Sequence, residues 1–278
     1  GAPGVNARIA LEGREIGIDA AHPVSLAVEL DFTGPQPRHF AAPRASARPF
    51  EAPGFAGSVE RGASCNCEVL TLIPHCNGTH TECAGHLTRE RLDAYRLAPV
   101  GLVPALLVSV TPVPGAECDE RSLPLPQPRD LLVTRAALAR AVPAALPFTA
   151  RALVIRTLPN TPDKRVRDYS GQTPPYLTQE AAGWLVERGI MHLIVDLPSI
   201  DRAQDEGRLT AHRIFFGLPP AVTQLAAATR AAATVTELAY IPESVADGPY
   251  LLELQVPALG GDAVPSRPLL YRLTDEAG

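Results

Sequence analysis

A strand–helix–strand segment in the middle of the chain places the firmest limit on the fold. Arg151–Thr157 is an apolar, β-branched run typical of a buried strand. Thr178 is a good helix N-cap and Gly189 a good helix end, so an amphipathic helix is predicted between them. Met191–Val195 predicts the next strand. Two strands joined in this way form a right-handed βαβ unit, so the chain is predicted to contain an α/β sheet.

Other segments indicate further strands and two more helices. Helices are expected over Leu131–Val142, which Pro143 ends, and over the alanine-rich run 226–233. Extended segments are expected over five stretches: Cys67–Ile73, Val100–Val110, Tyr250–Pro257, Leu269–Leu273 (as a last edge strand) and His22–Leu30, with a weak hairpin signal around Arg8–Glu12. Residues 112–128 contain five prolines and are expected to be irregular.

The densest group of possible metal ligands lies in Pro74–His86, which contains three of the seven histidines, two cysteines and a glutamate. Pro74, Gly78 and Gly85 predict a tight loop rather than a continuous helix. Because this loop follows the predicted strand 67–73, it is expected at the C-terminal end of a strand, a usual place for a site. Imidazole, thiolate and carboxylate groups bind zinc and similar metals, although a polar surface loop is an equally good interpretation of these residue types alone.

This stretch resembles the His-x-Gly-Thr-His-x-Asp-x-Pro-x-His signature of the metal-dependent cyclase and kynurenine formamidase family. Gly78, Thr79, His80 and the closing His86 match it. The later segment Asp196–Asp201 resembles the family's Asp-x-Pro-Ser-x-Asp, and the similarity runs from about residue 66 to 255. The resemblance implies an α/β fold: a swivelling β/α/β domain with a central mixed, barrel-like sheet flanked by helices. We therefore expect one cyclase-like domain over residues 1–278, with 1–63 as an irregular N-terminal arm and pocket segment.

Three positions depart from the signature. Cys76 stands in place of the first histidine, Glu82 in place of aspartate and Ala84 in place of proline. Glutamate keeps the carboxylate but moves it outward by one methylene, and cysteine makes the site softer and favours zinc over manganese. His75, one residue earlier, is an alternative for the first ligand.

The resemblance also implies a site and a reaction. It places a histidine and a glutamate in later segments, here His212 and Glu237, and gives the last histidine of the motif, His86, the role of general acid/base. The expected cofactor is a divalent metal, zinc or manganese, as one or two ions. One ion would be held by Cys76, His80 and Glu82, and a second by Glu82, His212 and Glu237.

The expected activity is metal-dependent hydrolysis of an amide, lactam or lactone bond in a small molecule, with metal-activated water as the nucleophile. The resemblance points to aryl amides such as those opened by arylformamidases. Two other classes stay open: a non-catalytic or metal-poor small-molecule-binding protein on the same fold, and a structural zinc protein with a closed four-ligand site. Four residues of the N-terminal segment are predicted to line the substrate pocket, or simply to cover the edge of the core: Phe32, His39, Phe40 and Phe55.

Composition excludes several other classes. The net charge of -5 and the absence of a basic tract argue against nucleic-acid binding, and no apolar run of eighteen residues predicts a membrane span. Five cysteines, an odd number, argue against a disulfide framework and for a reducing, cytoplasmic location. No signal pattern follows Gly1, and whether a leader was removed stays open. A redox-sensitive pair, Cys76 and Cys83, is a further interpretation. The family resemblance implies a homodimer or homotetramer.

Overall fold

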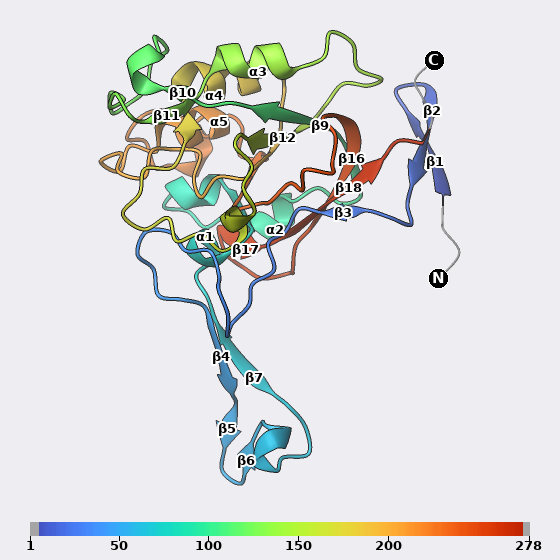
Figure 1. Ribbon diagram of the computed structural model, residues 1–278, viewed down its shortest axis with the longest axis vertical. Helices are drawn as coiled ribbons and strands as arrows, with labels where there is room; N and C mark the ends of the chain where they lie inside the picture. The colour runs from blue at the N-terminus through green and yellow to red at the C-terminus, as the bar shows by residue number, and fades with distance from the viewer. Residues whose placement is uncertain (1–5, 275–278) are drawn as a thin grey trace.

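The computed structural model describes residues 6–274, and a curled nine-stranded mixed sheet forms its centre (Figure 1). Its strand order is β17-β8-β15-β14-β12-β9-β16-β18-β3. The strands in this spatial order are Ala263–Pro265, His80–Cys83, Thr234–Glu237, His192–Val195, Ala152–Thr157, Leu102–Val110, Gly248–Gln255, Arg267–Arg272 and Val24–Ser25. The α/β class with a mixed, barrel-like sheet is therefore confirmed.

The middle of the sheet is parallel and both of its ends are antiparallel. Strands β15, β14, β12 and β9 run parallel to one another, whereas β8 and β17 at one end and β16, β18 and β3 at the other are antiparallel to their neighbours. Parallel strands are covered on both faces and read as continuous apolar runs, which is why β12 was visible in the sequence. Every residue of β12 is buried. The last predicted strand, β18, is not an edge strand, because it pairs with β16 and β3.

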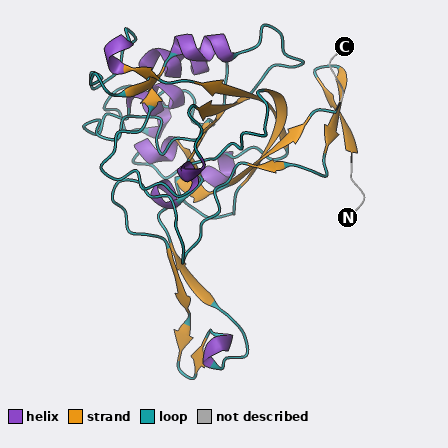
Figure 2. Ribbon diagram, in the orientation of Figure 1, coloured by secondary structure: helices purple, strands orange, loops and turns teal. Residues whose placement is uncertain are grey.

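The helices at 135–141, 179–187 and 210–216 cover one face of the sheet (Figure 2), whereas Ala94 of another helix packs with Cys83 and Val264. The α-helices α1 to α5 span Pro74–Asn77, Ala94–Leu97, Arg135–Ala141, Gln179–Glu187 and Thr210–Phe216. Short 3-10 turns η1 to η5 span Val59–Arg61, Ala84–Leu87, Gly115–Glu117, Pro162–Arg165 and Leu225–Ala227. The predicted β12–α4–β14 unit is confirmed, and the Thr178 hydroxyl caps α4 by accepting from the Ala181 N–H.

Two helix predictions need correction. The helix predicted over 131–142 begins only at Arg135, because Leu131–Val133 forms strand β11 between β10 (Val113–Pro114) and β13 (Tyr176–Leu177). The alanine-rich run 226–233 is not an α-helix. Its Thr229 and Arg230 N–H groups donate to carbonyls at the end of α5, so tertiary bonds override the helix propensity of alanine.

The N-terminal quarter contains two small β structures rather than an irregular arm. Strands β1 (Asn6–Leu11) and β2 (Arg14–Asp19) form the expected hairpin. A second ribbon, the arm, projects from the body and consists of β4 (Ser46–Pro49) paired with β7 (Glu68–Thr71), with β5 (Glu51–Ala52) and β6 (Phe55–Ala56) toward its far end (Figure 1). The strand predicted before the metal-ligand motif is therefore part of the arm and not of the central sheet. Within residues 6–274, no helix is long and apolar enough to cross a membrane.

Candidate metal centre

The ligand motif folds as a short helix, a buried strand and a 3-10 turn, whereas the sequence predicted a loop throughout. Pro74 begins α1, and the backbone is extended at Gly78. All four residues of β8 are buried between β15 and β17. The register sets His80 opposite Glu237, and alternation along a strand puts His80 and Glu82 on one face. Sheet pairing therefore brings together three of the predicted ligands.

Four predicted ligands form a tight cluster. His80, Glu82, His212 and Glu237 are each at most 3% exposed. His80 Nε2 lies 3.4 Å from Glu237 Oε2, and His212 Nε2 lies 2.6 Å from Glu82 Oε1 and 3.3 Å from Glu237 Oε1. Ligand atoms of His80, Glu82 and Glu237 all fall within 4.8 Å of one another, so one ion could contact all three. Two ligands bound at about 2.1 Å in tetrahedral geometry stand roughly 3.4 Å apart, close to most of these spacings.

Three of these four side chains, His80, His212 and Glu237, are each oriented by a second hydrogen-bond partner. His80 Nδ1 lies 2.9 Å from the Gly78 carbonyl oxygen, and His212 Nδ1 lies 2.7 Å from Asp201 Oδ2. With Nδ1–H donating to these oxygens, each Nε2 keeps its lone pair for a metal. The Ile200 N–H donates to Glu237 Oε1 at 2.8 Å. Asp201 is the last residue of the Asp-x-Pro-Ser-x-Asp segment, for which the sequence predicted no role in the site.

A second ligand group lies nearer the surface. His75, Glu82 and His86 also have ligand atoms within 4.8 Å of one another, so Glu82 belongs to both groups. His75 Nε2 is 3.4 Å from Glu82 Oε2 and 3.1 Å from Asp262 Oδ2, while His86 Nδ1 is 3.3 Å from that same Asp262 oxygen. The rings of His75 and His86 stack with centroids 4.4 Å apart. The adjacent His75 and His86 lower the pKa of Asp262 far below its usual range. Nothing in the sequence had marked this residue.

His75, not Cys76, joins these groups. Cys76 is buried in α1, and among the described residues neither ligand group includes it. Burial, and then the nearby Glu237, raise the pKa of the Cys76 thiol, which disfavours the thiolate that binds metals. Burial also raises the pKa of Cys83 to about 12. Both shifts weigh against the redox-sensitive pair.

The four predicted pocket residues do not gather at one place. His39 is buried near His80 and Glu237, and this burial lowers its pKa. Phe40 is exposed, and its ring lies against that of His39. Phe32 lines a separate apolar cavity of about 380 Å³ beside Pro74, Gly78 and Thr79. Phe55 lies on β6 of the arm, 6.4 Å from the ring of Phe50. Phe55 therefore does not lie with the ligand groups of its own chain, because its segment extends away from the body (Figure 1).

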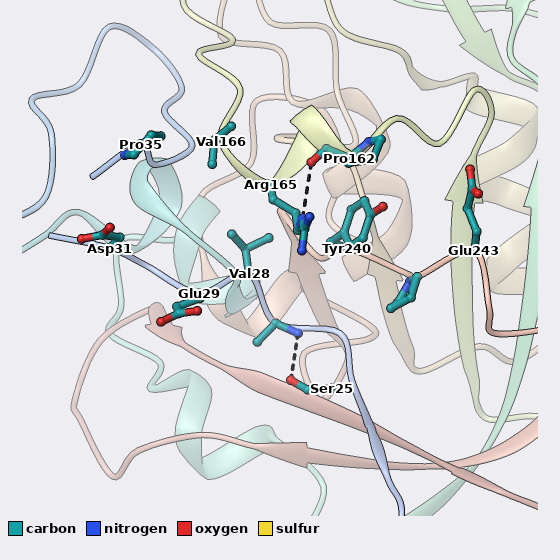
Figure 3. A pocket seen from close by; sticks show the side chains of 12 residues that line it. Ser25, Val28, Glu29, Asp31, Pro35, Pro162, Arg165, Val166, Tyr240 and Glu243 are labelled. Carbon is teal, nitrogen blue, oxygen red and sulfur yellow. Dashed lines mark hydrogen bonds between the residues drawn. The ribbon is translucent and has the colours of Figure 1, made fainter. Parts of the chain in front are cut away.

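A larger cavity, of about 800 Å³, is lined by residues of the N-terminal segment and of the segments around Pro162 and Tyr240 (Figure 3). The Arg165 guanidinium stacks over the Tyr240 ring at 5.1 Å, and three exposed carboxylates also line this cavity: Glu29, Asp31 and Glu243. No side chain of either ligand group is among its lining residues. Val28, which lines this cavity, donates its N–H to the hydroxyl of Thr79, the residue before the predicted ligand His80.

Unpaired buried atoms test whether a metal fits. His75 Nε2, His80 Nε2, Glu82 Oε1 and His212 Nε2 are all buried, and their nearest charged neighbours, at 2.6–3.4 Å, do not lie in hydrogen-bonding geometry. Each such group costs roughly 1–3 kcal/mol if left unsatisfied. Burial alone would lower the pKa of His80 and His212, but the surrounding glutamates raise both, and the same histidines lower the pKa of Glu237 despite its burial. The negative charge of the glutamates, which raises the pKa of these buried histidines, would equally stabilise a divalent cation, so the residues fit a metal.

The family assignment agrees with this geometry. The model of the cyclase family, described as "Putative cyclase", matches residues 18–202, and the chain belongs to that family. No curated protein matches the chain. Among solved structures, the chain resembles a potential metal-dependent hydrolase with cyclase activity, with a TM-score of 0.59, 17% identity and coverage of 90% of this chain and 97% of the other.

Two isatin hydrolases have a similar fold. Isatin hydrolase A from Labrenzia aggregata gives a TM-score of 0.57 at 15% identity, covering 90% of this chain and 93% of that one. Isatin hydrolase A from Ralstonia solanacearum gives 0.53 at 16% identity, covering 90% and 91%. At these identities the likeness concerns the fold, and the local geometry must support any statement about chemistry.

Proposed function

We propose that this protein is a metal-dependent hydrolase that cleaves an amide, lactam or lactone bond in a small molecule. The observation that carries the proposal is the shared carboxylate of Glu82, which joins a buried ligand group to one that is open to solvent. A buried group can hold an ion firmly, while an open neighbour leaves room for water and substrate. A bound divalent metal supplies activated water and polarises a carbonyl group.

The side chains divide this work. His80, His212 and Glu237 would hold one ion together with Glu82, and His75 with Glu82 would hold a second. His86 is our general acid/base, because it lies at the open side with a half-buried imidazole. Cys76 was the reason to expect zinc rather than manganese. With His75 in its place the donors are nitrogen and oxygen only, which suits either metal.

Cyclic or aryl amides are the proposed substrate class. Support comes from the isatin hydrolases of similar fold, whose names specify isatin as substrate, and from the motif's resemblance to kynurenine formamidases. A small, planar amide would reach the metal centre from the side of His75 and His86, where the exposed edge lies.

Metal analysis coupled to a substrate panel tests the function. Protein purified without a histidine tag is assayed for bound metal and then for hydrolysis of aryl formamides, lactams and lactones with zinc or manganese. We expect about two equivalents of metal and turnover that chelation abolishes and metal restores. Bound metal without turnover on any member of the panel would contradict the substrate class. No metal after reconstitution would favour a small-molecule-binding protein instead.

We also propose that the protein is a homo-oligomer. The arm exposes three large apolar side chains: Phe50, Val59 and Leu70. An isolated two-stranded ribbon is marginally stable in water, so contact with another copy would stabilise it. Light scattering after size-exclusion chromatography measures the mass, and a monomer at micromolar concentration would contradict this proposal.

A further inference from the structure

One carboxylate oxygen at the open side of the site serves two imidazoles. Asp262 Oδ2 lies 3.3 Å from His86 Nδ1 and 3.1 Å from His75 Nε2. We infer that Asp262 is a positioning residue that holds His86 in the orientation and tautomer needed for proton transfer. This inference rests on the proposed hydrolase function, in which His86 acts as general acid/base.

The backbone around Asp262 is anchored to the ligand strand. The Cys83 N–H donates to the Asp262 carbonyl oxygen at 3.0 Å, and β17 begins at the next residue, where Ala263 pairs with Glu82. On the other side, the Gly261 N–H donates to Asp93 Oδ1 at 3.0 Å, and the Gly261 carbonyl accepts from the Ala94 N–H. Asp262 is therefore fixed on both sides relative to the metal ligands.

Gly85 permits the close approach of Asp262 to the turn that carries His86. A Cβ atom at position 85 would lie 3.2 Å from the Asp262 Cβ and only 2.7 Å from the Leu92 carbonyl oxygen. Such contacts are too tight for ordinary packing, and the closest one is with a backbone atom rather than with a flexible side chain. The absence of a side chain at Gly85 thus lets the η2 turn and the Asp262 loop lie against each other, with His86 beside the carboxylate.

This arrangement defines the path of the proton. When Nδ1–H of His86 donates to Asp262, Nε2 is left as the basic nitrogen. In amide hydrolysis, water forms a bond to the carbonyl carbon and gives up one proton, which Nε2 accepts. The bond from that carbon to nitrogen then breaks, and the same proton passes from Nε2 to the leaving nitrogen. Asp262 stays ionised throughout and orients the ring.

The test combines kinetics, metal content and the tautomer of His86. Asp262→Ala and His86→Ala, and the double variant, are compared with wild-type protein in the metal-loaded state. We expect Asp262→Ala to lower kcat about 10–100-fold while KM and bound metal stay near wild-type values. Since Asp262 acts through His86, the double variant should be no worse than His86→Ala alone. Asp262→Glu should restore part of the lost turnover.

Nitrogen-15 spectra of the histidine side chains give a readout that needs no turnover. His86→Ala identifies the His86 signals, which should show Nδ1–H in wild-type protein and a mixture of tautomers in Asp262→Ala. Because this comparison does not depend on a substrate, it tests Asp262 even where the substrate panel fails. An unchanged tautomer would overturn the inference.

Asp93→Ala is the matched control. It removes the oxygen that accepts from the Gly261 N–H and so loosens the same loop, while the other partners of Asp93 are Arg91 and Arg96. If this variant lowers kcat as much as Asp262→Ala does, then general loosening of the loop explains the loss and the inference is wrong. Loss of metal in Asp262→Ala would equally contradict it, because Asp262 would then be acting on His75.

Discussion

The two halves of the candidate metal centre differ sharply. The inner half consists of His80, His212 and Glu237, which are almost fully buried, and the outer half consists of His75, His86 and Asp262, whose side chains are 26–39% exposed. Glu82 joins the two halves.

Burial explains why the halves differ. A buried polar group must find a partner, so every inner side chain is fixed by a second bond, from Gly78, Asp201 or Ile200. The exposed half has water available and can exchange residues at lower cost. Accordingly, the inner residues are those that the family resemblance predicts, whereas the outer half contains His75 in place of Cys76, the residue at the first-histidine position, which is buried in α1. The inner half is thus predicted to bind metal more tightly than the outer half.

Glu82→Gln should have the largest effect, because this residue serves both halves. Removing its charge leaves His212 and His75 without their shared carboxylate. We expect loss of most bound metal and a fall in kcat/KM of at least about 1,000-fold, measured by elemental analysis and hydrolysis. Glu90→Gln, an exposed change, is the control. Two retained equivalents in Glu82→Gln would show that the halves are independent.

The comparison of His75→Ala with Cys76→Ala separates the two candidates for the first ligand. His75 faces Glu82 and Asp262, whereas Cys76 is outside both ligand groups. We expect His75→Ala to reduce bound metal from about two equivalents to about one, and Cys76→Ala to keep both. Loss of one equivalent in Cys76→Ala but not in His75→Ala would show that Cys76 is the ligand and that the second ion lies in the buried part of the site.

Asp201→Asn should weaken the inner half without removing a ligand. Its carboxylate accepts from His212 Nδ1 and from the N–H groups of Ala211 and His212. We expect metal affinity to fall about 10–100-fold, as for other residues that orient metal-binding histidines. Competition with a fluorescent chelator measures this. An equal loss in the exposed variant Asp163→Asn would show that the assay does not report on the site.

Stability of the metal-free protein should depend on pH in a defined direction. The glutamates raise the folded pKa of His80 and His212 above 6.5, so their contribution is complete below pH 6.5 and is lost as pH rises through the folded values. The lowered pKa of Glu237 gives a contribution present above pH 4.5 and lost as pH falls through its folded pKa. With chelator present, Tm should fall by several degrees from pH 6 to pH 9. Metal-loaded protein should change less, and a rising Tm in the metal-free sample would contradict the shifts.

Alkylation of cysteines should have the smallest effect on activity. Cys65 and Cys67 are exposed on the arm segment, whereas Cys76 and Cys83 are buried with raised thiol pKa values. Brief treatment with iodoacetamide at pH 7 should label the first pair, as peptide mass spectrometry will show, and leave turnover within about twofold of the untreated enzyme. Rapid labelling of Cys83 with loss of metal would revive the redox interpretation.

The sequence predicted those elements whose conformation is determined by neighbouring residues in the chain. The buried strand β12, the capped helix α4 and the following β14 were all visible, because apolar runs and capping residues act over short distances. The ligands His212 and Glu237 came from family resemblance, and the structure places both beside Glu82 or His80.

Features that depend on tertiary pairing were not visible. The segment 68–71 has strand character in either location, and nothing local shows that it pairs with β4 in the arm instead of joining the central sheet. Asp262 lies in a glycine-containing loop far along the chain, and only the pairing of β17 with β8 brings it to His86. The choice between His75 and Cys76 depends on which way a single helical turn faces.

The pairing of β17 with β8 has a consequence for biosynthesis. Asp262 and His86 are 176 residues apart, so the ribosome releases one partner long before it makes the other. Until β17 emerges, one edge of β8 is unpaired, and the histidines of the motif are exposed to any metal in their surroundings. Contacts this distant in sequence form late and slowly. Loading of the proposed outer ion in its final surroundings is therefore expected only after β17 has been made and has paired with β8.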